Sequence, residues 1–511
     1  MVLLESLIAV ALLFLAISRN LIKDFRIIVY LMLATFVFSL LPSLSIPYIF
    51  DDVDHFHNLA QARDSHQITT WLLTPHNEHV IPLLKLLYIF CYQYFWLNPE
   101  FFHIVVVIIC VGIIGLAYQL IFVFTQSVPT ALIGGAIIAA TNLTDDAIFV
   151  GTNSHIFFCM FFFLLLFYAI YQYAATEQLK WKLIAFLAIL LGPSTFALGL
   201  TSVVFVPLFW RLCLPPHLQQ KSKDLLPLLF IGWLLSLIPY FYAMDAILHA
   251  KHYQDVGAAT AFQVAHFLAP VRFLGEYVAL KLLPSLFANP YLSFGLFFLC
   301  VATAIHYTKD IPWQKILFFV LFGLSNNFII FVFRDKWGTA GLDTARYYVF
   351  PVVMVAFSYA LILHFFIQTV PRIKQTSTVL LVYLLCAFAV TYGSLYRYKN
   401  ADLLLKETMV MQNLYVNFRK AFVNYFAMHN IDRPIEVKRG DILMPNVSRL
   451  TPKGGYAPAI SRYSLQSRQF YAQFVLPSSI NKKIVWSNKT NPDFLQYLTT
   501  NGYTFLIYGD E

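Results

Sequence analysis

Long, continuous apolar runs recur along this chain as far as residue 394, and they leave few architectures open. A helix that crosses a bilayer needs roughly 20 apolar residues, and most of the runs approach that length. They do not alternate with period two, which argues against a transmembrane β-barrel. The 511 residues are 59% hydrophobic and 12% charged, and a soluble protein of this size has too little interior for so much apolar surface. We therefore expect an all-α polytopic membrane protein.

The runs predict roughly twelve transmembrane helices. The first contains Glu5 and lacks a basic leader, so it is interpreted as a retained helix rather than a signal peptide. It is short for a full span, and a partly re-entrant helix is the alternative. The predicted spans lie near residues 2–18, 27–48, 101–124, 129–143, 155–175, 181–195, 197–211, 225–243, 289–306, 315–333, 347–368 and 377–394.

The basic residues of the short connectors predict the orientation. Lysine and arginine concentrate in the connectors that the positive-inside rule places in the cytoplasm. The remaining connectors carry acidic or mixed clusters, and the alternation of spans puts them and both termini on the opposite face. The basic connectors contain Arg19, Lys23 and Arg26; Lys180 and Lys182; Arg211, Lys221 and Lys223; Lys309 and Lys315; Arg372 and Lys374. The opposite connectors are 50–80, 142–154, 245–285 and 334–346.

One apolar stretch, residues 79–97, does not fit as a span. It contains Lys85, several tyrosines and Trp96, and a crossing there would break the alternation. We expect a juxtamembrane amphipathic helix in the outer interface, with Trp96 and Tyr94 at the level of the headgroups.

The composition turns polar after Tyr396. Strand-like runs such as 469–475 alternate with turn residues such as those at 453–455. We expect a small C-terminal α/β extracytoplasmic domain over 395–511, following a transmembrane domain over 1–394 whose first extracytoplasmic loop spans 50–100.

Charge and cysteine content narrow the classes of partner. The net charge is +9, yet no basic helix or aromatic-basic repeat is present, so nucleic acid is not expected as a partner. The six cysteines lie in or beside apolar segments without a CxxC pair, which indicates neither a zinc site nor a disulfide framework.

Three aspartates, Asp51, Asp52 and Asp54, follow the second apolar run directly. Like charges crowded beside lipid raise the pKa of at least one carboxyl group unless a cation compensates, and a carboxylate placed in this way can serve as the general base for an acceptor hydroxyl. Helix capping is the structural alternative. It explains one aspartate more readily than three, so we expect a functional role for at least one.

A second polar group, His76, Glu78 and His79, precedes the juxtamembrane helix. A helix start of this kind can bind an anion through its free N–H groups, and the ordinary alternative is a solvated helix terminus. With His55 and the aspartates, the two histidines could also hold a divalent metal ion. The HxxH spacing is weak evidence for one, so a phosphate or acceptor contact is the preferred interpretation, and a divalent metal ion stays open as the one cofactor that the residues suggest.

Two further clusters lie on the predicted outer face. Asp145 and Asp146 form a second acidic pair, which an ordinary polar loop would also explain. Arg346 begins an apolar helix where the positive-inside rule disfavours cations, and its guanidinium suits bidentate phosphate binding. Local pairing with Asp335 or Asp343 is the structural alternative. Lys336 and Arg272 are weaker candidates for the phosphate.

In this order, the clusters resemble the GT-C superfamily of glycosyltransferases that use polyprenyl-phosphate sugars, above all protein O-mannosyltransferases and lipid A aminoarabinose transferases. Asp51-Asp52 and the following HFHNLAQAR resemble the family's acidic pair and its helix. Ile81-Pro82-Leu83 resembles part of its proline motif, and Arg346-Tyr347 its late Arg-Tyr pair. The resemblance covers the layout of residues 27–394, and no resemblance is identified for the tail from 395.

The chain departs from the family in three respects. Its acidic pair is Asp-Asp instead of Asp-Glu, and an extra helix precedes the usual first one. The family's basic residue before the proline motif has three competing counterparts here, His76, His79 and Lys85, which leaves the acceptor-side and phosphate-side assignments open.

The resemblance implies an inverting glycosyltransferase whose site faces away from the cytoplasm. Asp51, or Asp52 next, would deprotonate an acceptor hydroxyl, and Arg346 would stabilise the departing lipid phosphate. The partners would be a polyprenyl-phosphate-sugar donor, membrane lipid, and a glycolipid, polysaccharide or protein acceptor. Compact loops favour a bacterial inner membrane over the endoplasmic reticulum. A transporter or flippase for an anionic lipid, and a non-catalytic assembly factor, are the alternatives.

Overall fold

The structure is a computed structural model. It describes residues 2–18, 26–46, 51–76, 79–95, 99–141, 151–249, 313–334, 349–369, 372–429, 435–438, 484–487 and 491–501. Every predicted apolar run within these ranges is helical, and the run at 289–306 lies outside them.

Six helical stretches of the described residues are long and apolar enough to cross a membrane. They are Ile27–Ser45, Glu100–Thr125, His155–Thr176, Leu225–Asp245, Trp313–Ile330 and Val379–Lys399. Shorter apolar helices cover Glu5–Ala16, Val128–Ala140, Ala197–Cys213 and Val349–His364. The helical membrane architecture expected from the sequence is therefore present, whereas roughly twelve crossings stay a prediction.

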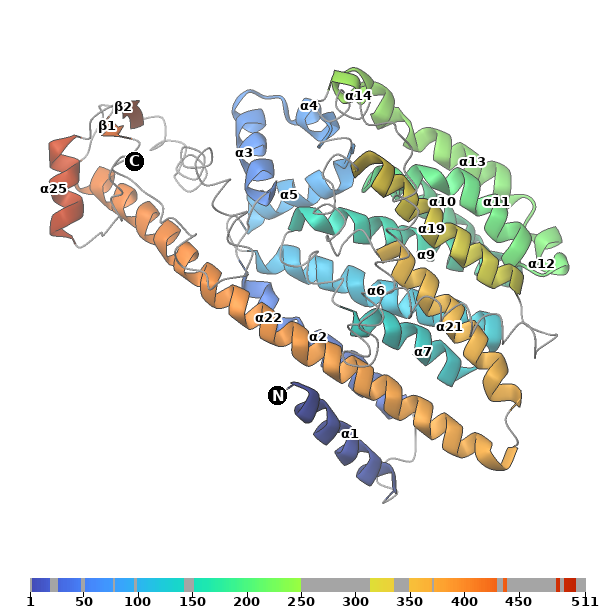
Figure 1. The fold of residues 1–511 in the computed structure, drawn as a ribbon. Coiled ribbons are helices and arrows are strands. Elements are labelled where there is room, and N and C mark those ends of the chain that lie inside the picture. The colour runs from blue at the N-terminus through green and yellow to red at the C-terminus, as the bar shows by residue number, and fades with distance from the viewer. Residues whose placement is uncertain are drawn as a thin grey trace.

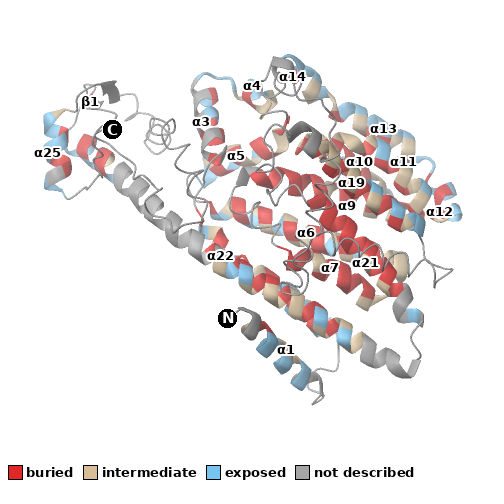
Figure 2. Cartoon of the chain, in the orientation of Figure 1, coloured by how far each residue is buried: buried red, intermediate tan, exposed pale blue. Residues whose placement is uncertain are grey.

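The bundle is built around α9 (His155–Thr176). It has the largest buried share of the six long stretches, 67%, and it packs against α6 (Glu100–Thr125) and α10 (Leu179–Leu191). Beyond α6 lie α7 (Val128–Ala140) and α21 (Val349–Thr369), and α21 packs on α19 (Trp313–Arg334). Figure 2 shows buried residues concentrated on α9, α7 and α21 in the middle of the bundle.

Aromatic side chains fill the contact between α9, α19 and α11 (Ser202–Cys213). The ring of Phe167 stacks on Phe209 with centroids 4.7 Å apart, and it meets Phe318 and Phe322 edge to face. Such edge-to-face packing adds to the burial of apolar area and fixes the rotation of α9, which begins at the candidate site.

Smaller helices complete the outer parts of the bundle. The helices α12 (Pro216–Lys221), α13 (Leu225–Ser236) and α14 (Ile238–His249) follow α11, and α14 packs against α4 (Ile68–Leu73). Short 3₁₀ turns join other elements: η1 (Leu41–Ser45), η2 (Gly151–Ser154) and η3 (Ala197–Thr201).

The helix α22 (Arg372–His429) has 58 residues and runs the length of the bundle. It packs on α7, on α2 (Arg26–Ser39) and on α1 (Val2–Ser18), and continues beyond the bundle on the side of α3 (Asp51–Asp64), as Figure 1 shows. The predicted boundary at 394/395 falls inside this helix, and the division into two domains stays a prediction.

A small unit lies at the far end of α22. The strands β1 (Ile435–Lys438) and β2 (Ile484–Ser487) are parallel, with Ile435 opposite Ile484. The helix α25 (Pro492–Thr500) packs on α22 through the rings of Phe494 and Tyr425, whose centroids are 4.8 Å apart. The predicted strand at 469–475 lies outside the described residues, so a C-terminal α/β domain stays a prediction.

The two ends of the bundle differ in character. Lys182 pairs with Asp224 at 2.5 Å and Lys221 with Glu177 at 2.6 Å, which joins two of the basic connectors at one end. The opposite end carries α3, α4 and α5 (Pro82–Tyr94). Because α9 runs from His155 to Thr176, it connects the two ends.

Candidate functional site

The predicted acidic loop is the helix α3 in the structure, and this helix is amphipathic. Among the α3 side chains that the structure describes, the buried ones recur at helical spacing, and they are Asp52, His55, Phe56, Leu59 and Ala62. The buried face of α3 thus carries a carboxylate and an imidazole one turn apart, at the end of the helix where the macrodipole favours negative charge.

A left-handed residue ends α3 and sets the direction of α4. His66 has φ of 59°, and the Gln67 amide donates to the Ala62 carbonyl at 2.7 Å, as in a Schellman motif. The chain therefore reverses within a few residues, and α4 folds back toward α3 and α5.

Asp52 is held by a tyrosine that the sequence reasoning missed. The Tyr88 hydroxyl of α5 donates to Asp52 Oδ1 at 2.5 Å, and the two side chains are 0% and 1% exposed. A hydrogen bond to a carboxylate is among the stronger bonds of a protein. A signal was present, because Tyr88 lies on the same face as Lys85, three residues on. The apolar context of α5, however, made Tyr88 look like a packing residue.

His55 lies between Tyr88 and His76. Its ring stacks on Tyr88 with centroids 4.9 Å apart and lies 4.5 Å from the ring of His76. Burial lowers the pKa of His55 well below its usual value, and the charges of His76, Lys85 and His155 lower it further. Its Nε2 atom is buried without a hydrogen-bond partner among the described residues.

Two backbone hydrogen bonds fold the second polar group back on itself. His76 and His79 exchange N–H···O bonds of 2.8 and 3.0 Å, so this turn is a tight bridge. The centroid of the His79 ring lies 4.2 Å from that of Phe196 and 5.6 Å from that of His155, the first residue of α9. The bridge thereby joins the first loop to the central helix. Glu78 lies outside the described residues.

Lys85 is buried and engaged with the end of α4. Its Nζ donates to the carbonyls of Trp71 at 2.6 Å and Thr74 at 2.5 Å, and lies 4.9 Å from the centre of the Trp71 ring. Burial lowers the pKa of Lys85 to about 7. A cation near the last carbonyls of a helix is a normal stabilising partner, so Lys85 joins α4 to α5.

These side chains surround a cavity of about 380 Å³ between α3 and α4. Its wall includes three of the predicted residues, His55, His76 and Lys85. The sequence reasoning did not single out the others, because amides and hydroxyls on short helices carry no distinctive pattern. They are Asn58, Ala62, Ser65, Gln67, Thr70, Trp71, Thr74 and Pro75.

The described residues contain no group of three histidine, cysteine or acidic side chains that could hold a metal ion. The interpretation of His55, His76 and His79 as ligands of a divalent metal ion gains no support from this part of the chain.

Several predicted site residues are not described in atomic detail. Asp51 and Asp54 lie on α3, and nothing is stated of their side chains. The others lie outside the described residues: Asp145, Asp146, Arg272, Lys336, Arg346 and Tyr347. The predicted meeting of Asp51 and Asp52 with Arg346 in one chamber therefore stays a prediction.

The helix α19, which precedes the predicted Arg-Tyr motif in the sequence, runs toward the end of the bundle that carries α3. The Thr201 hydroxyl donates to Asn326 Oδ1 at 2.9 Å, and Thr201 follows Phe196, which packs on His79. Since Asn326 lies in the second half of α19, that half is on the side of the cavity.

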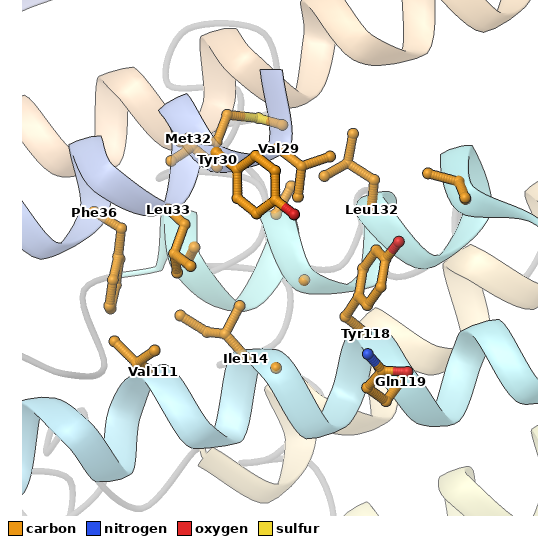
Figure 3. Close-up of a pocket in the computed structure, with 16 residues that line it drawn as sticks. Val29, Tyr30, Met32, Leu33, Phe36, Val111, Ile114, Tyr118, Gln119 and Leu132 are labelled. Atoms are coloured by element: carbon orange, nitrogen blue, oxygen red, sulfur yellow. The ribbon is translucent and has the colours of Figure 1, made fainter. Parts of the chain in front are cut away.

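A second hollow lies among the membrane helices. It has a volume of about 490 Å³ and is lined by α2, α6, α7 and Val390 of α22, with no charged side chain in its wall. Figure 3 shows Phe36 and Val111 toward one end, and Tyr118 and Gln119 toward the other. An apolar groove at this position suits a hydrocarbon chain.

Arg397 closes the bundle at the end that carries α3. It is 1% exposed and donates to Ser39 Oγ at 3.0 Å and to the carbonyls of Ala139 and Thr141 at 2.9 and 2.8 Å. Its guanidinium lies 4.8 Å from the centre of the Phe36 ring. Arg397 falls in the predicted tail from 395, because nothing in the sequence indicates that it caps α7.

Comparisons with known proteins return a distant structural similarity. No family model and no curated protein matches the chain. Among solved structures, the chain is similar to the crystal structure of ArnT from Cupriavidus metallidurans bound to undecaprenyl phosphate. The alignment has a TM-score of 0.46 and 14% sequence identity, and it covers 95% of this chain and 96% of that chain. At this level of similarity, function is argued from the residues themselves.

Proposed function

We propose that this protein is a membrane glycosyltransferase that moves a sugar from a polyprenyl-phosphate donor to an acceptor hydroxyl, with inversion. One observation carries the proposal: Asp52 is buried at the start of α3 and held by the hydroxyl of Tyr88, whose ring stacks on His55 in the wall of a polar cavity. A charged side chain is costly to keep out of water and, at the edge of a membrane bundle, suggests a functional site.

The reaction needs one base and one stabilised leaving group. An aspartate of the first loop, Asp51 or Asp52, accepts the proton of the acceptor hydroxyl. The acceptor oxygen bonds to the anomeric carbon as the bond from that carbon to the phosphate oxygen breaks, and the lipid phosphate leaves with the electron pair. A single displacement of this kind inverts the anomeric centre.

The donor side of the proposal rests on the arginine motif and the groove. Arg346, with Lys336 or Arg272, would bind the phosphate as its charge develops. The apolar groove along α2, α6 and α7 supports a lipid-linked donor, because its wall suits an isoprenoid chain. The sequence contains no Gly-rich nucleotide loop, so a lipid donor fits better than a nucleotide sugar.

The test is mass analysis of envelope glycolipids, polysaccharides and glycoproteins from cells with and without the protein. We expect one envelope component to lose a single sugar when the protein is absent. Restoring the wild-type protein should restore the sugar, whereas the double variant Asp51→Asn/Asp52→Asn should not. Glu177→Gln is the matched control, since it removes an acidic charge at the other end of the bundle.

A double variant that folds, reaches the membrane and restores the sugar in full would overturn the proposal. That outcome would favour a transporter or an assembly factor, neither of which needs a general base in this position.

A further inference from the structure

The wall of the cavity between α3 and α4 has two zones. The outer zone consists of exposed, uncharged groups that both donate and accept hydrogen bonds: Asn58, Ser65, Gln67, Thr70 and Thr74. The inner zone is buried and contains His55, Ala62, Lys85 and Trp71, and the half-buried side chains of Pro75 and His76 complete the wall. No carboxylate belongs to the described wall.

The inner zone offers little positive charge to an anion. Both hydrogen bonds of Lys85 go to backbone carbonyls at the end of α4, so its ammonium group is already engaged there, and burial lowers its pKa to about 7. Burial likewise lowers the pKa of His55, which is therefore uncharged. A phosphate would be desolvated here without a strong partner.

A ligand with several hydroxyl groups fits the hydrogen-bonding groups of this wall better than a phosphate does. Hydroxyl groups donate and accept, as do the Asn58 and Gln67 amides. The Ser65 and Thr74 hydroxyls donate to the Ala62 and Thr70 carbonyls and can still accept from a ligand. The buried Nε2 of His55 is without a hydrogen-bond partner among the described residues, and buried polar atoms normally have one. The cavity, at about 380 Å³, lies in the range of small-molecule sites, roughly 300–1,000 Å³.

We propose that this cavity is the acceptor subsite and that it binds a saccharide. The proposal rests on the glycosyltransferase function and adds to it the chemical class of the acceptor. A saccharide bound between α3 and α4 lies beside His55, whose ring stacks on the tyrosine that holds Asp52. The acceptor is then the sugar portion of a glycolipid or polysaccharide.

Binding is tested first without catalysis. The probes are oligosaccharides released from the envelope of cells that lack the protein, inorganic phosphate, and a peptide rich in serine and threonine. Each is added to the full-length protein in lipid nanodiscs, and hydrogen exchange is followed in the amides of residues 58–74. We expect the oligosaccharides to slow exchange in this segment, and phosphate and peptide to leave it unchanged.

Kinetics provide the second readout, with the donor and acceptor identified by envelope analysis. The double variant Asn58→Ala/Gln67→Ala changes two exposed side chains and leaves the core intact. We expect the KM for the acceptor to rise about tenfold to a hundredfold, with kcat and the KM for the donor unchanged. Gln178→Ala, an exposed amide at the start of α10, is the control that should change nothing.

Each contrary outcome has a definite meaning. Protection by phosphate alone, by the peptide alone, or by none of the probes overturns the saccharide subsite. So does a double variant that transfers sugar with an unchanged acceptor KM. If oligosaccharides protect the segment but the wild-type protein transfers no sugar, the glycosyltransferase function fails while the binding site remains.

Discussion

At the scale of single residues, the buried polar groups of the first loop depend on one another. Asp52 is held by the Tyr88 hydroxyl, His55 stacks on the Tyr88 ring, and Lys85 is tied to α4. Sequence reasoning identified Asp52, His55 and Lys85, because charged or titratable residues beside apolar runs are conspicuous. It missed Tyr88 because the sequence of an apolar helix does not show whether a tyrosine only packs or also donates a hydrogen bond.

The Tyr88 hydroxyl should matter to the reaction more than to the fold. Tyr88→Phe keeps the ring but removes the donor that favours the charged form of the Asp52 carboxylate. We expect kcat to fall by about tenfold to a hundredfold, and the acidic limb of the pH–rate profile to move to higher pH. Tyr92→Phe, one turn on in α5, is the control. An unshifted profile would show that Tyr88 only packs.

Lys85 should make the stability of the protein depend on pH. Burial lowers its folded-state pKa to about 7, while an unfolded lysine titrates near 10.4. Between these values the unfolded chain binds more protons, so stability rises with pH from about 7 to about 10. We expect the Tm of wild type in detergent to gain more across this window than that of Lys85→Met. Parallel Tm curves would contradict this assignment.

At the scale of elements, the sequence predicted which residues form helices, but it did not predict how far each helix extends. The apolar runs predicted helices correctly throughout the described ranges, since apolar length alone decides a helix in lipid. The continuation of α22 to His429 was missed because the change to polar composition was taken as a boundary. The absence of glycine and proline from 394–433 was the signal that helix continues there.

The contact between α22 and α7 should tolerate no side chain at Gly393. A Cβ added there would lie 2.3 Å from the Ala140 carbonyl oxygen and 2.9 Å from its Cα, so backbone would have to move. We expect Gly393→Ala to lower stability by about 1–3 kcal/mol, as overpacking does. Gly115→Ala is the matched control, since its Cβ would meet nothing within 4 Å. Equal melting of the two variants would refute the close contact.

At the scale of the whole molecule, the bundle has a polar-cavity end and an ion-paired end, joined by α9. The positive-inside rule anticipated that the basic connectors around Lys182 and Lys221 lie together. The detailed site was beyond sequence reasoning, because it depends on the fold of α4 between α3 and α5, and α4 has only six residues.

Thiol labelling of intact cells tests which end faces outward. We expect a membrane-impermeant maleimide to label Thr69→Cys, on α4, in intact cells, and His217→Cys, on α12, only after permeabilisation, because both positions are exposed and lie at opposite ends. The described native cysteines are buried; Cys300, which lies outside the described residues, is replaced by serine in the background. The reverse labelling would invert the topology and place the cavity in the cytoplasm.

The cap that Arg397 places on α7 has a consequence for biosynthesis. Thr141 and Arg397 are 256 positions apart, and a ribosome adding roughly 5–20 residues per second needs about ten seconds to about a minute to cover them. Throughout that interval the last carbonyls of α7 are already made while their guanidinium partner is not. The nascent chain therefore gains this cap only when α22 emerges, and in a product truncated before Arg397 those carbonyls lack their guanidinium partner.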